Sequence, residues 1–269
     1  MAPERIEWHG ALNTRVGAPD RPRITLPLQA STAGGSGTFL ASDESGQRWW
    51  VKPLNNRQGH RVTVTEAIVG KMGALIFAPV CQTSVLYLPP EIAGWEFRPG
   101  SFIEVGNAHG SRAVDKAQED RNVLYPDRDD NRARNAGAVA LWDWCWGGDP
   151  QWLYAELEDR RLYSHDHGWY LPDEGPTWTS ATLAARVDQP HPTPWPHPDL
   201  SVAELRRLAD ALLAVRRSHL VDILRHIPTD WPVTNEELEA VGWFLERRAE
   251  PVAARLNVLA DSRTGGGAS

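Results

Sequence analysis

A histidine-flanked aspartate stands out in the stretch LYSHDHGWYL, residues 162–171. His165, Asp166 and His167 are residue types that bind metal ions or move protons, and β-type residues lie on both sides of them. Two interpretations follow: a metal site built on the histidines, or one aspartate presented at the end of a hairpin. On a strand, residues two apart share a face, so the histidines would face one way and Asp166 the other.

A zinc site would need three or four convergent ligands. His191 and His197 in the Pro-rich loop QPHPTPWPHP are the further candidates, but there is no Cys-rich or His-Glu-x-x-His pattern. The second interpretation is therefore favoured, with Asp166 as a metal-binding carboxylate and with His165 and His167 supporting the backbone from the other face. A metal hydrolase built on the histidines stays open as a less favoured hypothesis.

Two charged residues nearer the N-terminus lie in apolar surroundings. Lys52 follows the hydrophobic run Trp49–Val51, and a lysine on a buried strand requires an anionic partner. A strand end that extends its lysine to solvent is the alternative. Glu66 lies among apolar residues of a helical segment, where a surface position is the simpler interpretation of this residue alone.

A glycine-rich turn, STAGGSGTF (residues 31–39), precedes the lysine. Glycine lets a backbone approach a ligand closely, and the exposed amides of such a turn can hold phosphates. A flexible hairpin turn is the simpler interpretation of this stretch alone. The residues concerned are Gly34, Gly35, Ser36 and Gly37.

The elements that position these residues change in character along the chain. Short β-rich runs separated by glycine-containing turns predict antiparallel hairpins over about residues 23–53, and helical spacing of apolar residues predicts a helix over 62–77. Two more strands are expected, over 80–89 and 100–105. A helix over 132–147 and a hairpin over 151–171 follow.

The last part of the sequence is predicted to be helical. Ser201 with Glu204 and Thr234 with Glu237 each fit a capping box at a helix N-terminus. The result is an α+β fold with two lobes and a cleft between them. We expect a β-rich lobe over residues 1–105, a mainly helical lobe over 106–262 and a disordered tail over 263–269.

Composition bounds the partners and the compartment. With 41% hydrophobic and 23% charged residues among 269, the chain resembles an ordinary globular protein. A net charge of −7 argues against nonspecific nucleic-acid binding. No segment has the ~20 apolar residues of a membrane helix, and Cys81 and Cys145 form no disulfide framework. We expect a cytoplasmic protein without membrane or nucleic-acid partners.

A glycine turn, a strand lysine and a helical glutamate, in that order, are typical of the nucleotide-holding half of a protein kinase. Asp149 in WGGD and Asp166 in HDHG then follow as a candidate base and a candidate metal ligand. Several stretches resemble HipA-like kinases, which implies a two-lobed protein-kinase-like fold. The resemblance covers roughly residues 25–250, with its similar stretches at 51–80, 99–112, 141–171 and 227–248.

The resemblance implies phosphoryl transfer from ATP with magnesium to a protein or small-molecule hydroxyl. The roles that it implies are phosphate binding for Lys52, pairing with Lys52 for Glu66, orientation of the acceptor hydroxyl for Asp149 and magnesium binding for Asp166. The glycine turn would hold the nucleotide, and the backbone from Glu104 to Gly106 would border the adenine.

The sequence departs from the HipA-like pattern after Asp149. The family usually has a basic residue next and an asparagine five positions on, which binds a second metal ion; here Pro150 and Tyr154 occupy these positions. Tyrosine is a poor magnesium ligand, and the spacing of Gln151 is wrong for a substitute. An active kinase with one metal ion and a nucleotide-binding pseudokinase with a scaffold or regulatory role both remain open.

Overall fold

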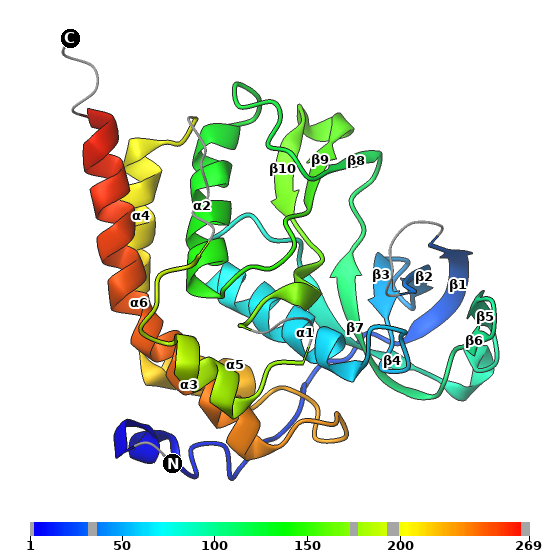
Figure 1. Ribbon diagram of the computed structural model, residues 1–269. Helices are drawn as coiled ribbons and strands as arrows, with labels where there is room; N and C mark the ends of the chain where they lie inside the picture. The colour runs from blue at the N-terminus through cyan, green and yellow to red at the C-terminus, as the bar shows by residue number, and fades with distance from the viewer. Residues whose placement is uncertain (1–2, 32–36, 173–176, 193–198, 265–269) are drawn as a thin grey trace.

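The first half of the chain forms a five-stranded antiparallel sheet, in a computed structural model that describes residues 3–31, 37–172, 177–192 and 199–264. The strand order is β1-β2-β3-β7-β4. Helix α1 crosses the middle of the molecule, between this sheet and the C-terminal helices (Figure 1). The elements are β1 Ile24–Ala30, β2 Phe39–Asp43, β3 Arg48–Lys52, α1 His60–Leu75, β4 Thr83–Leu88 and β7 Gly106–Arg112.

Alternation along β3 sends its side chains to two environments. Trp49 and Val51 lie in an apolar cluster on one face of the sheet, together with Phe39 of β2 and Phe97. A small hairpin of β5 (Glu96–Arg98) and β6 (Ser101–Phe102) contributes Phe97 to that cluster. Trp50 and Lys52 therefore face the other way, because successive strand residues point to opposite faces.

Strand β7 extends the N-terminal sheet beyond the lobe boundary expected at residue 105. It lies between β3 and β4, and pairs with both. Its sequence GNAHGSR has little β propensity, which is why the pattern did not predict it. Small residues are needed here, because a Cβ on Gly110 would overlap the side chain of Leu86. The chain leaves the sheet only after Arg112.

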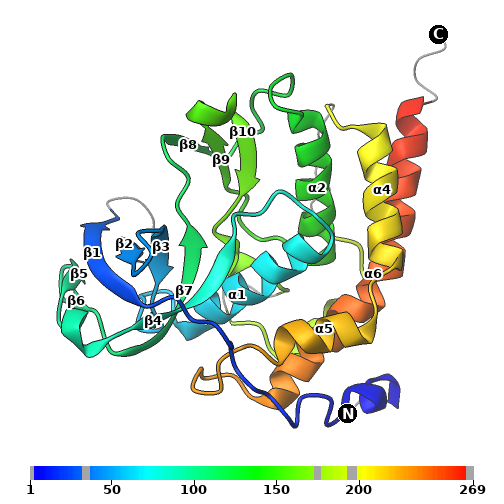
Figure 2. The ribbon, with the colours of Figure 1, turned by 180° about the vertical axis from the view of Figure 1, so that it is seen from behind.

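The N-terminal residues pack with the C-terminal helices, although they were expected in the first lobe (Figure 2). The 3-10 helix η1 (Pro3–Trp8) brings the Trp8 Nε1 atom within 2.6 Å of Glu246 Oε2. The Leu12 amide donates to Glu239 Oε1 at 3.0 Å. Both glutamates belong to α6 (Asn235–Thr264). The first lobe thus begins near β1.

The rest of the chain combines a second sheet with helices. The sheet has the order β10-β9-β8, and α4 packs along α6 (Figure 1). The remaining elements are β8 Ala117–Asp120, α2 Asn131–Trp144, β9 Trp152–Ala155, β10 Arg161–Ser164, α3 Ser180–Arg186, α4 Val202–Leu213 and α5 Arg217–Leu224. The α+β class is as predicted, as are the 151–171 hairpin and the helix now seen as α2.

The predicted helix caps are present in part. Thr234 Oγ1 accepts from the Glu237 amide at 3.1 Å, and the Glu237 carboxylate accepts from the Thr234 amide at 2.8 Å, a complete capping box. Ser201 Oγ accepts from the Glu204 amide at 3.3 Å, while the Glu204 carboxylate pairs with Arg207. Helix α6 runs to Thr264, so the start of the expected tail is helical, and the remainder, 265–269, lies outside the described residues.

None of the helices in the described ranges combines the length and apolarity required to cross a bilayer.

Candidate active site

Lys52, Glu66 and Asp166 form one contiguous charged cluster. Lys52 Nζ lies 2.5 Å from Glu66 Oε1 and 2.7 Å from Asp166 Oδ1. The Lys52 and Glu66 side chains are 4% and 5% exposed, whereas that of Asp166 is 29% exposed. The expected pairing of Lys52 with Glu66 is thus present. Glu66 and Asp166 are 14 and 114 positions from Lys52 in sequence, and both contact its ammonium group.

The Asp-His-Gly sequence joins this cluster to helix α1. Asp166 has a left-handed backbone, with φ of 52°. The next amide, of His167, donates to Glu66 Oε2 at 3.0 Å. A Cβ on Gly168 would overlap Val62 of α1, so only glycine lets the helix approach this closely. The motif therefore fixes both carboxylates that contact Lys52.

The left-handed turn at Asp166 also overturns the predicted alternation of the two histidines. His165 lies in the same pocket lining as Asp166, instead of on the opposite face. His167 begins the 3-10 helix η4 (His167–Trp169), and its Nε2 atom lies 2.8 Å from Ser164 Oγ. Strand alternation does not apply here, because β10 ends at Ser164.

Two carboxylates share one ammonium group, and their pKa values diverge. Burial raises the pKa of Glu66 to about 7, against the opposing effect of Lys52. Burial would also raise the pKa of Asp166, but Lys52 outweighs it and holds that pKa well below the ordinary value. Burial would lower the pKa of Lys52, and the two carboxylates raise it instead. Near neutral pH Asp166 is ionised and Lys52 is charged.

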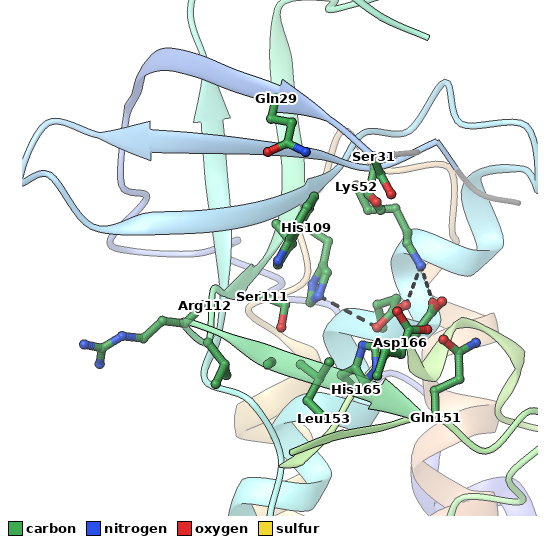
Figure 3. A pocket seen from close by; sticks show the side chains of 16 residues that line it. Gln29, Ser31, Lys52, His109, Ser111, Arg112, Gln151, Leu153, His165 and Asp166 are labelled. Atoms are coloured by element: carbon green, nitrogen blue, oxygen red, sulfur yellow. Dashed lines mark hydrogen bonds and ion pairs between the residues drawn. The ribbon is translucent and has the colours of Figure 1, made fainter. Parts of the chain in front are cut away.

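The cluster lies at the wall of a pocket of about 300 Å³ (Figure 3). Both sheets contribute to it: β1, β3 and β7 from the first, β8 and β9 from the second. The pocket lining is Gln29, Ser31, Thr38, Trp50, Lys52, Glu66, His109, Ser111, Arg112, Val114, Ala117, Glu119, Gln151, Leu153, His165 and Asp166. A pocket between two sheets that ends at a buried lysine suits an elongated anion.

The imidazoles in the lining are uncharged at neutral pH. Burial lowers the pKa of His109 to about 3 and that of His165 to about 4. Within the described ranges, no three His, Cys, Asp or Glu side chains are grouped to hold a metal ion. His191 instead lies 2.8 Å from the Gly147 carbonyl oxygen, and His197 lies outside the described residues. These facts do not support a histidine-based metal hydrolase.

The expected nucleotide-binding residues are placed unevenly. Gly34, Gly35 and Ser36 lie outside the described residues. Gly37 is described, with φ of 72°, a conformation that favours glycine. Ser31 and Thr38, at the two ends of the same turn, are joined by a 3.0 Å hydrogen bond from the Ser31 amide, and both line the pocket.

The segment expected to border the adenine lies elsewhere. Among the described residues that line the pocket, neither Glu104 nor Gly106 is present, because Gly106 pairs with Leu88 at the start of β7. Val114 and Ala117, which follow the other end of β7, line the pocket instead. The lobe boundary expected at residue 105 falls before β7, whereas the chain leaves the first sheet only after Arg112.

Asp149 lies beside the pocket and not in its lining. Its Oδ2 atom accepts from Gln151 Nε2 at 3.0 Å and lies 3.4 Å from Arg121 Nη2. Gln151 does line the pocket, so Asp149 is one hydrogen bond away from the lining. The preceding glycine is sterically required, since a Cβ on Gly148 would overlap the Trp169 carbonyl oxygen. Sequence reasoning had given Gln151 no role.

Tyr154 is a structural residue in β9. Its side chain is fully buried in a cluster with Trp152 and Leu162. The hydroxyl donates to the Asn122 carbonyl oxygen at 3.0 Å and accepts from the Leu124 amide at 2.7 Å. Position 154 therefore faces away from the pocket, whereas Leu153 faces into it.

Replacing Tyr154 with asparagine should destabilise the protein by about 3–5 kcal/mol without any gain in turnover. The change removes a buried ring and places no ligand in the pocket. Tyr154→Phe should cost only about 1–3 kcal/mol, for the two unpaired backbone groups. Urea unfolding measures both. Higher turnover by Tyr154→Asn would show that this position supplies the second metal ligand after all.

Comparison with known proteins defines the class of fold. No protein-family model and no curated protein matches the chain. The Helicobacter pylori proinflammatory kinase CtkA has a similar structure, with a TM-score of 0.56 at 10% identity over 90% of this chain and 98% of that chain. The Golgi casein kinase matches with a TM-score of 0.45 at 11% identity over 97% of this chain and 77% of that chain, and its Mn/ADP-bound form at 10% identity with the same TM-score and coverage.

The chain therefore has a protein-kinase-like fold, with a β-rich N-terminal part and a helical C-terminal part.

Proposed function

We propose that this protein is an ATP- and magnesium-dependent phosphotransferase of the HipA-like kinase type, acting on a hydroxyl of a protein or small molecule. The observation that carries the proposal is the contact of Lys52 with both Glu66 and Asp166 at the pocket wall. A buried lysine held by a helical glutamate, next to a partly exposed aspartate, is what a phosphate-binding lysine beside a metal site requires.

The donor set fits a magnesium ion. Asp166 offers carboxylate oxygens at the pocket, and magnesium prefers such ligands, completed by water and substrate phosphates. Asp166 would hold the ion, and the bound ion would neutralise negative charge on the phosphates. Of the three carboxylates in the lining, Glu66 is buried and Glu119 lies on β8, whereas Asp166 both contacts Lys52 and is 29% exposed.

The protein's own residues supply binding and proton transfer. Lys52 would bind the phosphates, and Glu66 holds its ammonium group in place from α1. Asp149 would orient the acceptor hydroxyl and take its proton as the oxygen attacks the terminal phosphorus. Gln151, by its hydrogen bond to Asp149, fixes the direction of that carboxylate.

A nucleotide-binding pseudokinase is the second candidate. The observation that favours it is Tyr154, whose buried hydroxyl serves the backbone where a HipA-like kinase would have a metal-binding asparagine. Magnesium-dependent ATP turnover separates the two candidates, since only the kinase consumes ATP.

Asp166→Asn tests the proposed site. Magnesium should tighten ATP binding to the wild type, and this dependence should disappear in the variant, because an amide is a poorer magnesium ligand than a carboxylate. Asparagine retains an oxygen that can accept from Lys52, so the fold should persist. Calorimetric titrations with ATP, with and without magnesium, measure the effect.

Asp188→Asn is the matched control, since Asp188 is 70% exposed and pairs with Arg247. In Asp188→Asn, magnesium should tighten ATP binding as much as it does in the wild type. Undiminished magnesium dependence in Asp166→Asn would contradict the assignment of Asp166 as the metal ligand.

A further inference from the structure

Trp50 shares the pocket with the phosphate-binding lysine. It lies two residues before Lys52 on β3, so both side chains leave the same face of the sheet. Both line the pocket, whereas Val51 between them is buried on the opposite face. Two strand residues span roughly 6–7 Å, which separates the indole from the ammonium group along the pocket.

An apolar residue faces the sheet from the other side of the pocket. Leu153 of β9 lies below the strands of the first sheet (Figure 3). Val114 and Ala117 add two more apolar side chains to the lining, next to the connection between the sheets. The pocket thus has a charged end, at Lys52 and Asp166, and an apolar part bounded by Trp50 and Leu153.

Some backbone groups of residues 113–116, which connect β7 to β8, already make hydrogen bonds. The Ala113 amide donates to the Arg48 carbonyl oxygen at 3.0 Å, and the Lys116 carbonyl oxygen accepts from the Glu156 amide at 3.1 Å. The Ala113 amide cannot also donate to the polar edge of a ligand, and one of the two lone pairs of the Lys116 carbonyl oxygen is already used. Recognition of a flat ligand would therefore depend more on contact with its faces.

We propose that Trp50 is the stacking platform for the base of a purine nucleotide, with Leu153 against the other face of the base. This rests on the proposed function, which places the phosphates at Lys52. An indole has two fused rings, and so does a purine, so a purine covers more of it than a pyrimidine does. Stacking of a base on an aromatic side chain makes a substantial contribution to affinity and needs no specific hydrogen bonds.

The test compares ligands with and without a base, in the presence of magnesium. Trp50→Leu should weaken ATP binding about 5- to 150-fold, the range that one base–aromatic stack provides. Binding of inorganic tripolyphosphate should change less than about twofold, since that ligand has no base to stack. Trp50→Phe should retain most of the ATP affinity, and wild type should bind ATP more tightly than UTP. Isothermal titration calorimetry measures each affinity.

Trp95→Leu is the matched control. Trp95 is another half-buried tryptophan, but it packs on Phe39 on the far face of the sheet, with ring centroids 5.7 Å apart. Trp95→Leu should leave the affinity for ATP unchanged. Unfolding curves of all variants establish that they are folded at the assay temperature.

Three results would overturn the inference. If Trp50→Leu binds ATP as the wild type does, the indole does not contact the base. If it binds ATP more tightly, Trp50 fills the space instead of stacking. If Trp50→Leu weakens the binding of tripolyphosphate as much as the binding of ATP, Trp50 acts on the phosphate end of the ligand. A wild type that binds neither ligand would overturn the proposed function itself, and with it this inference.

Discussion

Replacing Asp149 with alanine should lower turnover about 10²- to 10⁴-fold, the usual contribution of a positioned proton acceptor. ATP affinity should change little, because Asp149 lies outside the pocket lining and contacts Gln151 and Arg121. Steady-state phosphoryl transfer and calorimetric binding of ATP measure the two quantities separately.

Arg121→Ala provides the control for the loss of charge next to Asp149. The Arg121 side chain is 73% exposed, so its 3.4 Å contact with Asp149 contributes little. Its turnover should stay near that of the wild type. Equal turnover by wild type and Asp149→Ala would contradict the role of Asp149, and the absence of turnover in both, with ATP still bound, would identify a pseudokinase.

Lys52→Met should abolish detectable ATP binding and, at alkaline pH where Glu66 is ionised, destabilise the protein by about 3–5 kcal/mol, the cost of leaving a buried charge without its partner. The Glu66 side chain is 5% exposed and loses its only ammonium partner in the described part of the chain. A methionine matches the shape of the lysine stem and adds no new charge. Urea unfolding at several pH values and calorimetry with ATP measure the effects.

The pH dependence of this variant has a definite sign. The pKa of Glu66, already raised to about 7 by burial, should rise further without Lys52. A raised pKa in the folded state means that stability is lost as the pH rises through it, so Lys52→Met should be least stable at alkaline pH. Lys52→Met/Glu66→Gln should recover most of that loss. Stability that increases with pH in Lys52→Met would contradict this account of the cluster.

The cluster was predictable because its charged residues follow one another in an order that is typical of protein kinases. A lysine after an apolar strand requires an anionic partner, but a surface position was the simpler interpretation of Glu66 alone, so their pairing was predicted from the resemblance to HipA-like kinases. The Asp-His-Gly sequence added a glycine that the approach of α1 requires.

The errors have a different origin, in contacts that the sequence does not display. Strand β7 is held by neighbours on both sides, and its GNAHGSR sequence carries no strand pattern. The boundary of the first lobe was therefore placed too early, at residue 105. Asp166 has a left-handed backbone conformation, and His165 lines the pocket together with it. Strand periodicity does not predict a single left-handed residue.

Because the N-terminal segment packs on α6, the helical lobe is built from two parts of the sequence that lie on either side of the first lobe. Leu12 and Glu239 are 227 residues apart in sequence. Trp8 packs directly against Gly242 of α6, where a Cβ would overlap the Trp8 ring. Contacts this distant in sequence can form only after the last helix has been synthesised, so the helical lobe cannot complete its packing before the whole chain exists. No single cut between the lobes would yield two complete halves, whereas a circular permutant that begins near β1 and carries residues 3–17 after α6 would gather each lobe into continuous sequence.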